Sequence, residues 1–224
     1  MTTILGLKGI NYGYIDGGFK REILKNLEYD FQSGTFYTIL GASGSGKTTL
    51  LSLMAGLDKP ESGTISYEGE SIEKMGLYKY RRNKIGVVFQ AYNLVSYLTG
   101  LENILLAMTE TDNKIPKNHK EVAYALLNMV GIVNTKADRL VTHLSGGEQQ
   151  RIAIARAIAG NEDLIFADEP TGNLDTQTEQ EIIRIFKMMA EKYGKTVIVV
   201  THSNEVSKLS DQRVLLKDGV LQDI

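Results

Sequence analysis

The segment Gly41–Thr48, with the sequence GASGSGKT, restricts the possible folds of this 224-residue chain more than any other feature. It fits the phosphate-binding pattern G-x-x-x-x-G-K-[ST], which requires a buried strand before it and a helix after it. Phe36–Leu40 has the composition of a short buried strand, and the leucines and methionine of Thr48–Ala55 have helical spacing. The segment therefore predicts a glycine loop at a strand-to-helix turn, with a nucleoside triphosphate as its ligand.

The composition of the loop also predicts how it contacts the ligand. Glycines allow close approach of the backbone, so successive N–H groups and the positive end of the following helix face the phosphates. We expect the Lys47 ammonium to reach the β- and γ-phosphates and the Thr48 hydroxyl to complete the oxygen shell of a Mg²⁺ ion. The predicted nucleotide contacts of this region are Gly41, Ser43, Gly44, Ser45, Gly46, Lys47, Thr48 and Thr49.

Composition argues against several other classes of protein. A net charge of −2 gives no basic footprint, so nucleic acid is not an expected partner. The chain has no cysteine, which excludes disulfides and thiolate metal sites and permits a reducing cytosolic setting. We expect neither a signal peptide nor a membrane-spanning helix, because no apolar stretch approaches about 18 residues. Any link to a membrane is therefore expected to run through another chain.

The order of apolar runs predicts an α/β fold. Residues 1–35 alternate as antiparallel strands do, with Asp16–Gly18 as a hairpin turn. From about 101 to 159 the apolar spacing becomes helical, and a further helix is expected at about 176–192. The short strands predicted beyond the glycine loop are Thr64–Tyr67, Ile85–Phe89, Leu164–Ala167 and Thr196–Val200. The last two flank the 176–192 helix, which is the βαβ arrangement of a parallel sheet.

Two carboxylates, Asp168 and Glu169, directly follow the Leu164–Ala167 strand. Open α/β sheets bind their ligands at the carboxyl ends of the strands, so this pair stands at the expected place for a site. Asp168 is predicted to hold Mg²⁺ through coordinated waters, and Glu169 to direct the water that attacks the γ-phosphate. The alternative is an acidic strand end that caps the next turn.

A second phosphate-binding motif is predicted in Leu144–Arg151, with the sequence LSGGEQQR. Ser145 and Glu148 fit the S-x-x-E capping box of a helix start. Capping alone does not require Gly146 and Gly147, whereas a side-chain-free pair at a helix N-terminus suits an anion, so Ser145 and Gly147 are candidate phosphate contacts. The stretch resembles the LSGGQ signature of ATP-binding cassette proteins, with Glu148 where glutamine is common.

This resemblance covers essentially the whole chain and implies roles for residues in three further loops. Gln90 matches the glutamine loop, which implies contact with Mg²⁺ and water; its alternative is a solvated strand-end side chain. Asp175 matches the D-loop, which implies contact between two copies; alternatively it belongs to a turn before a helix. His202 matches the switch histidine, which implies a hydrogen bond to the γ-phosphate and orientation of Glu169; alternatively it is a structural histidine.

The family also implies an aromatic contact to adenine. Tyr14 fits this role best by spacing and Tyr12 second, and packing within the β layer is the alternative for both. The implied cofactors are ATP and Mg²⁺. The resemblance assigns catalysis to Glu169, His202 and Gln90, and the metal to Thr48, Gln90 and Asp168.

The implied fold is that of a P-loop NTPase: an α/β RecA-like core with a parallel sheet, an N-terminal antiparallel β layer and an inserted α-helical subdomain. We expect one domain spanning residues 1–224. Its core is expected at about 1–90 and 160–224, and its helical subdomain at about 91–159.

The resemblance also implies two protein partners. One is a second copy of the chain, arranged head to tail so that each ATP lies between Lys47 of one copy and Ser145 of the other. The other is a transmembrane permease subunit, which would hold the chain at the cytoplasmic face of the cell membrane. A candidate docking face, or alternatively a part of the helical subdomain's own packing, is formed by Tyr92, Leu94, Val95, Tyr97 and Leu98.

Several stretches are similar to one subgroup of the family, the ATPase subunits of macrolide, lipoprotein and antimicrobial-peptide resistance exporters. They are Gly41–Lys47, Phe89–Leu94, Leu98–Asn103 and Ala167–Asp175. This similarity implies export of peptides, lipoproteins or drugs. Ala42, where proline is usual, and Ser33–Thr35, in place of the common Gly-Glu, are departures that we expect to leave nucleotide chemistry intact.

The alternative function is a nontransport ATPase of the same subgroup that regulates a membrane partner, such as a regulator of cell-wall hydrolases. A DNA-repair ATPase of the family fits less well, because such chains carry a long coiled coil between the glycine loop and the signature. A GTPase is not expected either, since the base-reading motif Asn-Lys-x-Asp does not occur.

Overall fold

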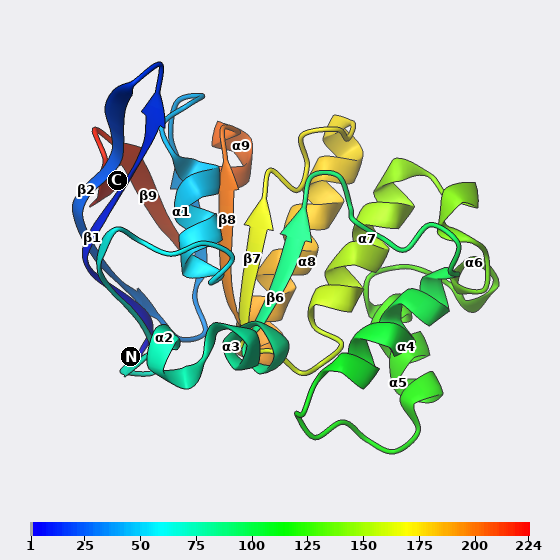
Figure 1. Cartoon of the computed structure of the whole chain (residues 1–224). Helices are drawn as coiled ribbons and strands as arrows, with labels where there is room; N and C mark the ends of the chain where they lie inside the picture. The colour runs from blue at the N-terminus through cyan, green and yellow to red at the C-terminus, as the bar shows by residue number, and fades with distance from the viewer. Residues whose placement is uncertain (1) are drawn as a thin grey trace.

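A computed structural model describes residues 2–224 and contains two sheets, which stand side by side in Figure 1. The first is antiparallel, with strand order β2-β1-β4-β5, and its strands are β1 (Thr3–Asp16), β2 (Phe19–Gln32), β4 (Ser62–Tyr67) and β5 (Glu70–Ser71). The second has the order β10-β9-β3-β8-β7-β6, and β9, β3, β8, β7 and β6 run parallel. Its strands are β3 (Phe36–Leu40), β6 (Ile85–Phe89), β7 (Leu164–Asp168), β8 (Thr196–Thr201), β9 (Gln212–Lys217) and β10 (Val220–Asp223).

The helices lie around these sheets. They are α1 (Lys47–Met54), α2 (Ile72–Met75), α3 (Leu77–Asn83), α4 (Gly100–Glu110), α5 (His119–Met129), α6 (Asn134–Ala137), α7 (Gly146–Ala157), α8 (Thr176–Tyr193) and α9 (Asn204–Ser207), with a 3₁₀ turn at Val141–His143. Among residues 2–224, none of the helices is both long and apolar enough to cross a lipid bilayer. The predicted α/β fold, with its parallel sheet and antiparallel layer, is confirmed.

The long hairpin of β1 and β2 turns where the sequence predicts. Asp16 pairs with Phe19, and the two residues between them, Gly17 and Gly18, have φ of 57° and 86°. Two consecutive left-handed residues give a turn whose twist matches that of the flanking strands, which explains the glycine pair. The hairpin projects at the upper left of Figure 1, beyond the carboxyl ends of the parallel strands.

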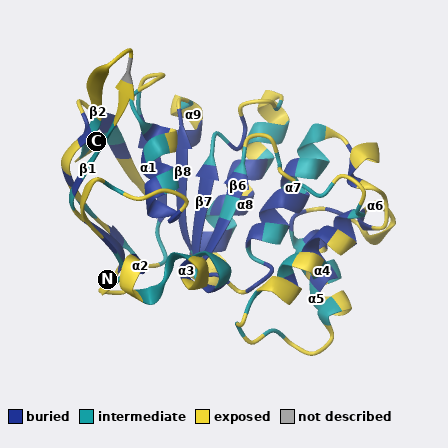
Figure 2. Cartoon of the chain, in the orientation of Figure 1, coloured by how far each residue is buried: buried dark blue, intermediate teal, exposed yellow. Residues whose placement is uncertain are grey.

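The central strands are buried on both faces, which Figure 2 shows as dark blue arrows. In β7, Ile165 and Ala167 pack into a core with α7 and α8, whereas Leu164 and Phe166 pack into a core with α1 and the antiparallel layer. Successive side chains of a strand point to opposite faces. An uninterrupted apolar run is therefore what a strand needs when both faces of its sheet are covered.

The helices α4, α5 and α6 pack together at the right of Figure 1, and α7 contacts both this group and strand β6. The contact with β6 is close: a Cβ on Gly86 would lie 1.7 Å from the carbonyl oxygen of Ala157. Because α7 belongs by contact to both parts of the molecule, the helical subdomain at 91–159 stays a prediction.

Candidate functional site

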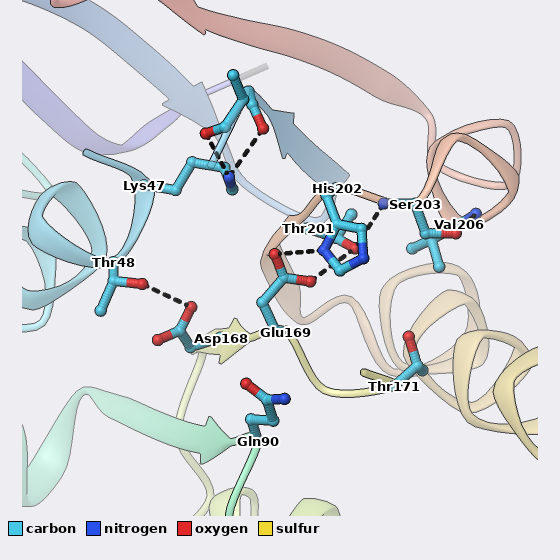
Figure 3. Close-up of polar contacts among 12 residues, drawn as sticks. Lys47, Thr48, Gln90, Asp168, Glu169, Thr171, Thr201, His202, Ser203 and Val206 are labelled. Atoms are coloured by element: carbon cyan, nitrogen blue, oxygen red, sulfur yellow. Dashed lines mark hydrogen bonds and ion pairs between the residues drawn. The ribbon is translucent and has the colours of Figure 1, made fainter. Parts of the chain in front are cut away.

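The glycine loop connects β3 to α1, and its backbone is set by glycines. Gly44 and Gly46 have φ of 75° and 98°, a region that other residues rarely adopt. Gly41 has no room for a side chain, because a Cβ there would lie 2.5 Å from Ser45 Oγ and 3.0 Å from the Leu216 carbonyl oxygen. The Lys47 ammonium donates to the carbonyl oxygens of Gly41 (2.8 Å) and Ala42 (3.1 Å), so it is held over the loop (Figure 3).

Thr48 and Asp168 come together although they are far apart in the sequence. Thr48 Oγ1 donates to Asp168 Oδ1 over 3.2 Å, from the start of α1 to the end of β7. Burial raises the pKa of Asp168, and the Thr48 hydrogen bond opposes that shift. A hydroxyl and a carboxylate oxygen beside the phosphate-binding loop are the hard donors that Mg²⁺ prefers, so these residues fit the predicted ion.

Glu169 is fixed in an unusual backbone conformation. Its φ is 43°, in the left-handed region, while its N–H donates to the Val200 carbonyl (3.0 Å) and its carbonyl accepts from Gly172 N–H (3.1 Å). A glutamate in this conformation costs about 1–3 kcal/mol and persists only where its surroundings fix it. The side chain turns to the end of β8, where His202 Nδ1 lies 3.0 Å from Glu169 Oε1.

Gln90 directly follows β6 and is exposed. Its Nε2 donates to Asn173 Oδ1 over 3.3 Å, and a Cβ on Gly172 would lie 3.0 Å from the same nitrogen. Figure 3 shows Gln90 below Asp168 and Glu169, with its side chain directed toward them. The structure therefore brings the predicted glutamine loop next to the two carboxylates.

A cavity of about 320 Å³ opens at this edge of the sheet, and we call it the loop cavity. Seven predicted nucleotide contacts line it: Tyr14, Ser43, Gly44, Gly46, Lys47, Thr48 and Thr49. Two predicted catalytic residues, Glu169 after β7 and His202 after β8, line it as well. Of the two candidate aromatics, Tyr14 lines the cavity, while the Tyr12 hydroxyl donates to Asp58 Oδ2 (2.5 Å). Ser45 lines a neighbouring cavity between β2 and the β9–β10 turn.

The signature residues line a different cavity, of about 500 Å³, which we call the signature cavity. Ser145 and Gly147 lie there at the N-terminus of α7, and the two cavities share no lining residue. The capping box is present: Ser145 Oγ accepts from Glu148 N–H (3.4 Å) and Glu148 Oε2 accepts from Ser145 N–H (2.9 Å). Within the described chain, the signature residues and Lys47 are therefore not brought together.

Asp175 acts as the N-cap of α8. Its Oδ1 accepts from the N–H groups of Gln177 (3.1 Å) and Thr178 (3.0 Å), and its Oδ2 accepts from the Thr178 hydroxyl (2.6 Å). The Thr178 hydrogen bonds lower the pKa of Asp175. The structure thus gives this residue a capping role, and the contact between copies stays a prediction.

A family model described as "ABC transporter" matches residues 24–172. The chain belongs to the ABC transporter family. It is 44% identical over 217 residues to the "Uncharacterized ABC transporter ATP-binding protein YclH" of Bacillus subtilis, with 97% of this chain and 95% of that protein covered. It is 38% identical to the "Lipoprotein-releasing system ATP-binding protein LolD" of Cytophaga hutchinsonii, with 94% of each covered.

A larger relative is the "Macrolide export ATP-binding/permease protein MacB" of Rhodopirellula baltica, which is 39% identical. The match covers 98% of this chain and 33% of that protein, so the chain spans about a third of its length. Among solved structures, the "Dimeric structure of a post-hydrolysis state of the ATP-binding cassette MJ0796 bound to ADP and Pi" has a TM-score of 0.88 at 36% identity. That match covers 99% of this chain and 98% of the other. The expected family, its ATPase activity and the MacB- and LolD-like subgroup are confirmed.

Two polar side chains of this region, Asn173 and Thr201, were not among the site residues predicted from the sequence. Asn173 accepts from Gln90, and Thr201 Oγ1 donates to Glu169 Oε2 over 3.2 Å. A polar residue at the carboxyl end of a parallel strand is the sequence signal for Thr201, since ligands of open α/β sheets bind at that edge. Asn173 carries no comparable signal, because asparagine is common in any turn.

Proposed function

We propose that this ABC transporter subunit hydrolyses ATP between two copies of itself and drives a permease that exports peptides, lipoproteins or drugs. The observation that carries the proposal is the separation of the two phosphate-binding motifs into the loop cavity and the signature cavity. No residue lines both cavities, so within the described chain the signature does not contribute to the loop cavity. A head-to-tail pair would use both motifs twice, in a closed symmetric assembly.

In the proposed mechanism, Tyr14 stacks on adenine and the loop N–H groups bind the phosphates, with Lys47 released from the loop carbonyls to the β- and γ-phosphates. Mg²⁺ would be held by Thr48, Gln90 and Asp168, and it supplies charge neutralisation at the phosphate oxygens. Glu169 orients the attacking water and receives its proton, while His202 donates to the γ-phosphate. The 3.0 Å contact between Glu169 and His202 supports these paired roles.

The second copy contributes the signature. Its Ser145 and the N-terminus of its α7, where Gly146 and Gly147 have no side chains, would face the γ-phosphate, and the helix dipole there favours negative charge. ATP thereby supplies the charge complementarity that closes the pair, and hydrolysis loosens it. The relative MJ0796 has been solved as a dimer, which supports the same arrangement here.

A transmembrane permease is the second proposed partner, and it would hold the chain at the cytoplasmic face of the cell membrane. The segment after Gln90 is interpreted either as a docking face for the permease or as part of the packing of the helical subdomain. It contains one residue that fits each interpretation. Leu94 packs against the core with α7 and α8, whereas Tyr97 has 78% of its surface exposed. Tyr97 is therefore the residue of this segment that we propose for docking. Export as the direction of transport rests on the names of MacB and LolD.

The pairing is tested with a variant that binds ATP but hydrolyses it slowly. We expect Glu169→Gln to be a monomer without nucleotide and to double its mass in light scattering when ATP and Mg²⁺ are added. Its hydrolysis should fall by about 10² to 10⁴, the usual contribution of general-base assistance. An unchanged mass with ATP demonstrably bound would contradict the proposal.

Ser145→Asp in the Glu169→Gln background provides a matched control. Aspartate is as good an N-cap as serine, so α7 keeps its start. Its charge would face the triphosphate of the other copy and should prevent dimerisation, while binding of ATP to the glycine loop is retained. A dimer that forms equally well in this variant would show that the signature does not meet ATP.

A further inference from the structure

Thr201 is the last residue of β8, and only 1% of its surface is exposed. Its hydroxyl lies in the middle of a chain of two hydrogen bonds (Figure 3). Ser203 N–H donates to Thr201 Oγ1 over 3.1 Å, and Thr201 Oγ1 donates to Glu169 Oε2 over 3.2 Å. A hydroxyl has a single proton to donate, and here that proton is directed at a carboxylate.

The Glu169 carboxylate thus has a separate partner for each oxygen. Oε1 faces His202 Nδ1 at 3.0 Å, and Oε2 faces the Thr201 hydroxyl. The two side chains differ in how freely they can change rotamer, because the His202 side chain is 71% exposed and Thr201 is buried. A buried β-branched side chain is restricted to few rotamers, whereas an exposed imidazole can turn without loss of packing. Thr201 is the fixed anchor of the pair.

This difference matters because His202 is also proposed to donate to the γ-phosphate, and its exposed ring is free to turn while it does so. Whenever the ring turns away from Oε1, the remaining side-chain contact of the Glu169 carboxylate is Thr201. The backbone of Glu169 is already fixed by its bonds to Val200 and Gly172. The orientation of the carboxylate about its side-chain torsions is then determined by the Thr201 hydroxyl.

We propose that Thr201 is a positioning residue for ATP hydrolysis: its hydroxyl holds Glu169 Oε2 so that Oε1 faces the attacking water while His202 donates to the γ-phosphate. This rests on the proposed role of Glu169 as general base. Thr201 itself exchanges no proton with the substrate; the water gives its proton to Glu169, and its oxygen bonds to the γ-phosphorus as the bond to ADP breaks. The contribution of Thr201 is confined to orientation, which acts on the chemical step.

Thr201→Val is the informative substitution, because it keeps the shape and β-branching and removes only the hydroxyl. We expect kcat to fall by roughly 10-fold, equivalent to about 1.4 kcal/mol, with the KM for ATP changed less than about 2-fold. Thr201→Ser restores the donor and should keep kcat within about 3-fold of the wild-type value. Thr196→Val is the matched control.

Thr196 begins the same strand, is fully buried, and uses its hydroxyl to accept from Gly34 N–H (2.9 Å). Its replacement should lower stability without lowering kcat. Thermal unfolding and ATP binding are measured for all three variants, so that loss of fold is separated from loss of positioning. If Thr201→Val keeps wild-type kcat, or if Thr201→Ser is as slow as Thr201→Val, the proposal is overturned.

Single-turnover hydrolysis by Glu169→Gln, with and without Thr201→Val, tests whether Thr201 acts through Glu169. We expect no further fall from the second substitution, since the carboxylate is already gone. A further 10-fold fall would show that Thr201 acts by another route and would overturn the inference. If Glu169→Gln alone has wild-type activity, the proposed role of Glu169 fails instead, which is a separate outcome.

Discussion

Glu162, in the connection between α7 and β7, is expected to make folding stability depend on pH. Its side chain is buried at 7% exposure, and its Oε2 has no hydrogen-bond partner among the described residues. Burial raises the pKa of Glu162 from 4.5 to about 7, although the N–H groups of Glu162 and Gly160 and the ammonium of Lys195 oppose the shift. The folded state therefore binds this proton more tightly than the unfolded state does.

The sign follows from proton linkage. The pKa of Glu162 is higher in the folded state than in the unfolded state, so protonation of its carboxyl stabilises the folded state. This contribution to the free energy of unfolding is fully present below pH 4.5 and is lost as the pH rises through 7. Integrating between these two pKa values gives a loss of about 2 kcal/mol between pH 5.5 and pH 8. Glu162→Gln cannot titrate, so its free energy of unfolding should not include this decline. The difference between variant and wild type should grow by about 2 kcal/mol over that range.

Urea denaturation at several pH values between 5.5 and 8 measures this difference directly. Glu61→Gln is the control, since Glu61 forms an exposed pair with Lys20 and its removal should change stability by less than about 1 kcal/mol at every pH. Parallel pH profiles for Glu162→Gln and the wild type would refute the reasoning, because they would mean that Glu162 titrates alike in the folded and unfolded states.

Three other predictions test the fold and the site. Gly86→Ala should destabilise the protein by about 3 kcal/mol in urea, because its Cβ would meet the backbone of Ala157 at 1.7 Å; unchanged stability would contradict that close approach. Tyr14→Ala should raise the KM for ATP roughly 10-fold through loss of base stacking, while Tyr12→Phe should leave the KM unchanged. Equal effects of the two substitutions would contradict the assignment of Tyr14 as the adenine contact. Tyr97→Glu should abolish transport in vesicles reconstituted with the permease while the ATPase activity of the isolated subunit persists; retained transport would contradict docking at Tyr97.

The parallel strands β3, β6, β7 and β8 and the phosphate-binding loop could be predicted from the sequence because each has a local cause. Strands such as β7 supply apolar side chains to two cores, so their composition is continuous and conspicuous. The carboxyl ends of such strands meet at one edge of the sheet. The sequence predicted one Mg²⁺ site for Asp168 and Thr48, and the structure brings these two side chains, 120 residues apart, within 3.2 Å of each other.

Other elements have weaker local signals. The helices α2 and α3 span only four and seven residues, too short for a hydrophobic period to be recognised. The β9–β10 hairpin lies at the edge of the sheet and has exposed residues, although its turn at Asp218 and Gly219, with φ of 53° and 86°, carries a recognisable Asp-Gly signal. The helices α2 and α3 were therefore missed because they are short, and the β9–β10 hairpin because it lies at the edge of the sheet.

The choice between Tyr12 and Tyr14 depends on irregularity in β1. Its pairing with β2 shifts register between Leu7 and Ile10, between Ile10 and Tyr12, and between Tyr12 and Gly13. Each shift breaks the alternation that assigns side chains to faces, so spacing alone leaves both tyrosines open. The left-handed φ of Glu169 is equally hidden, since glutamate has no special preference for that conformation.

The two cavities are separate, yet one short segment connects them. Residues 169–175 begin at Glu169 in the loop cavity and end at Asp175, whose carboxylate binds Thr178. Thr178 lines the signature cavity, and a Cβ on Gly147 would lie 2.6 Å from its methyl group. In the proposed pair of copies, this segment would link the general base of one ATP site to the signature that contacts the other ATP. If ATP of the other copy binds at the signature as proposed, a displacement of α7 would press on Thr178. The hydrogen bond of Thr178 to Asp175 and the six peptide units from Asp175 to Glu169 would then form a short path to the carboxylate.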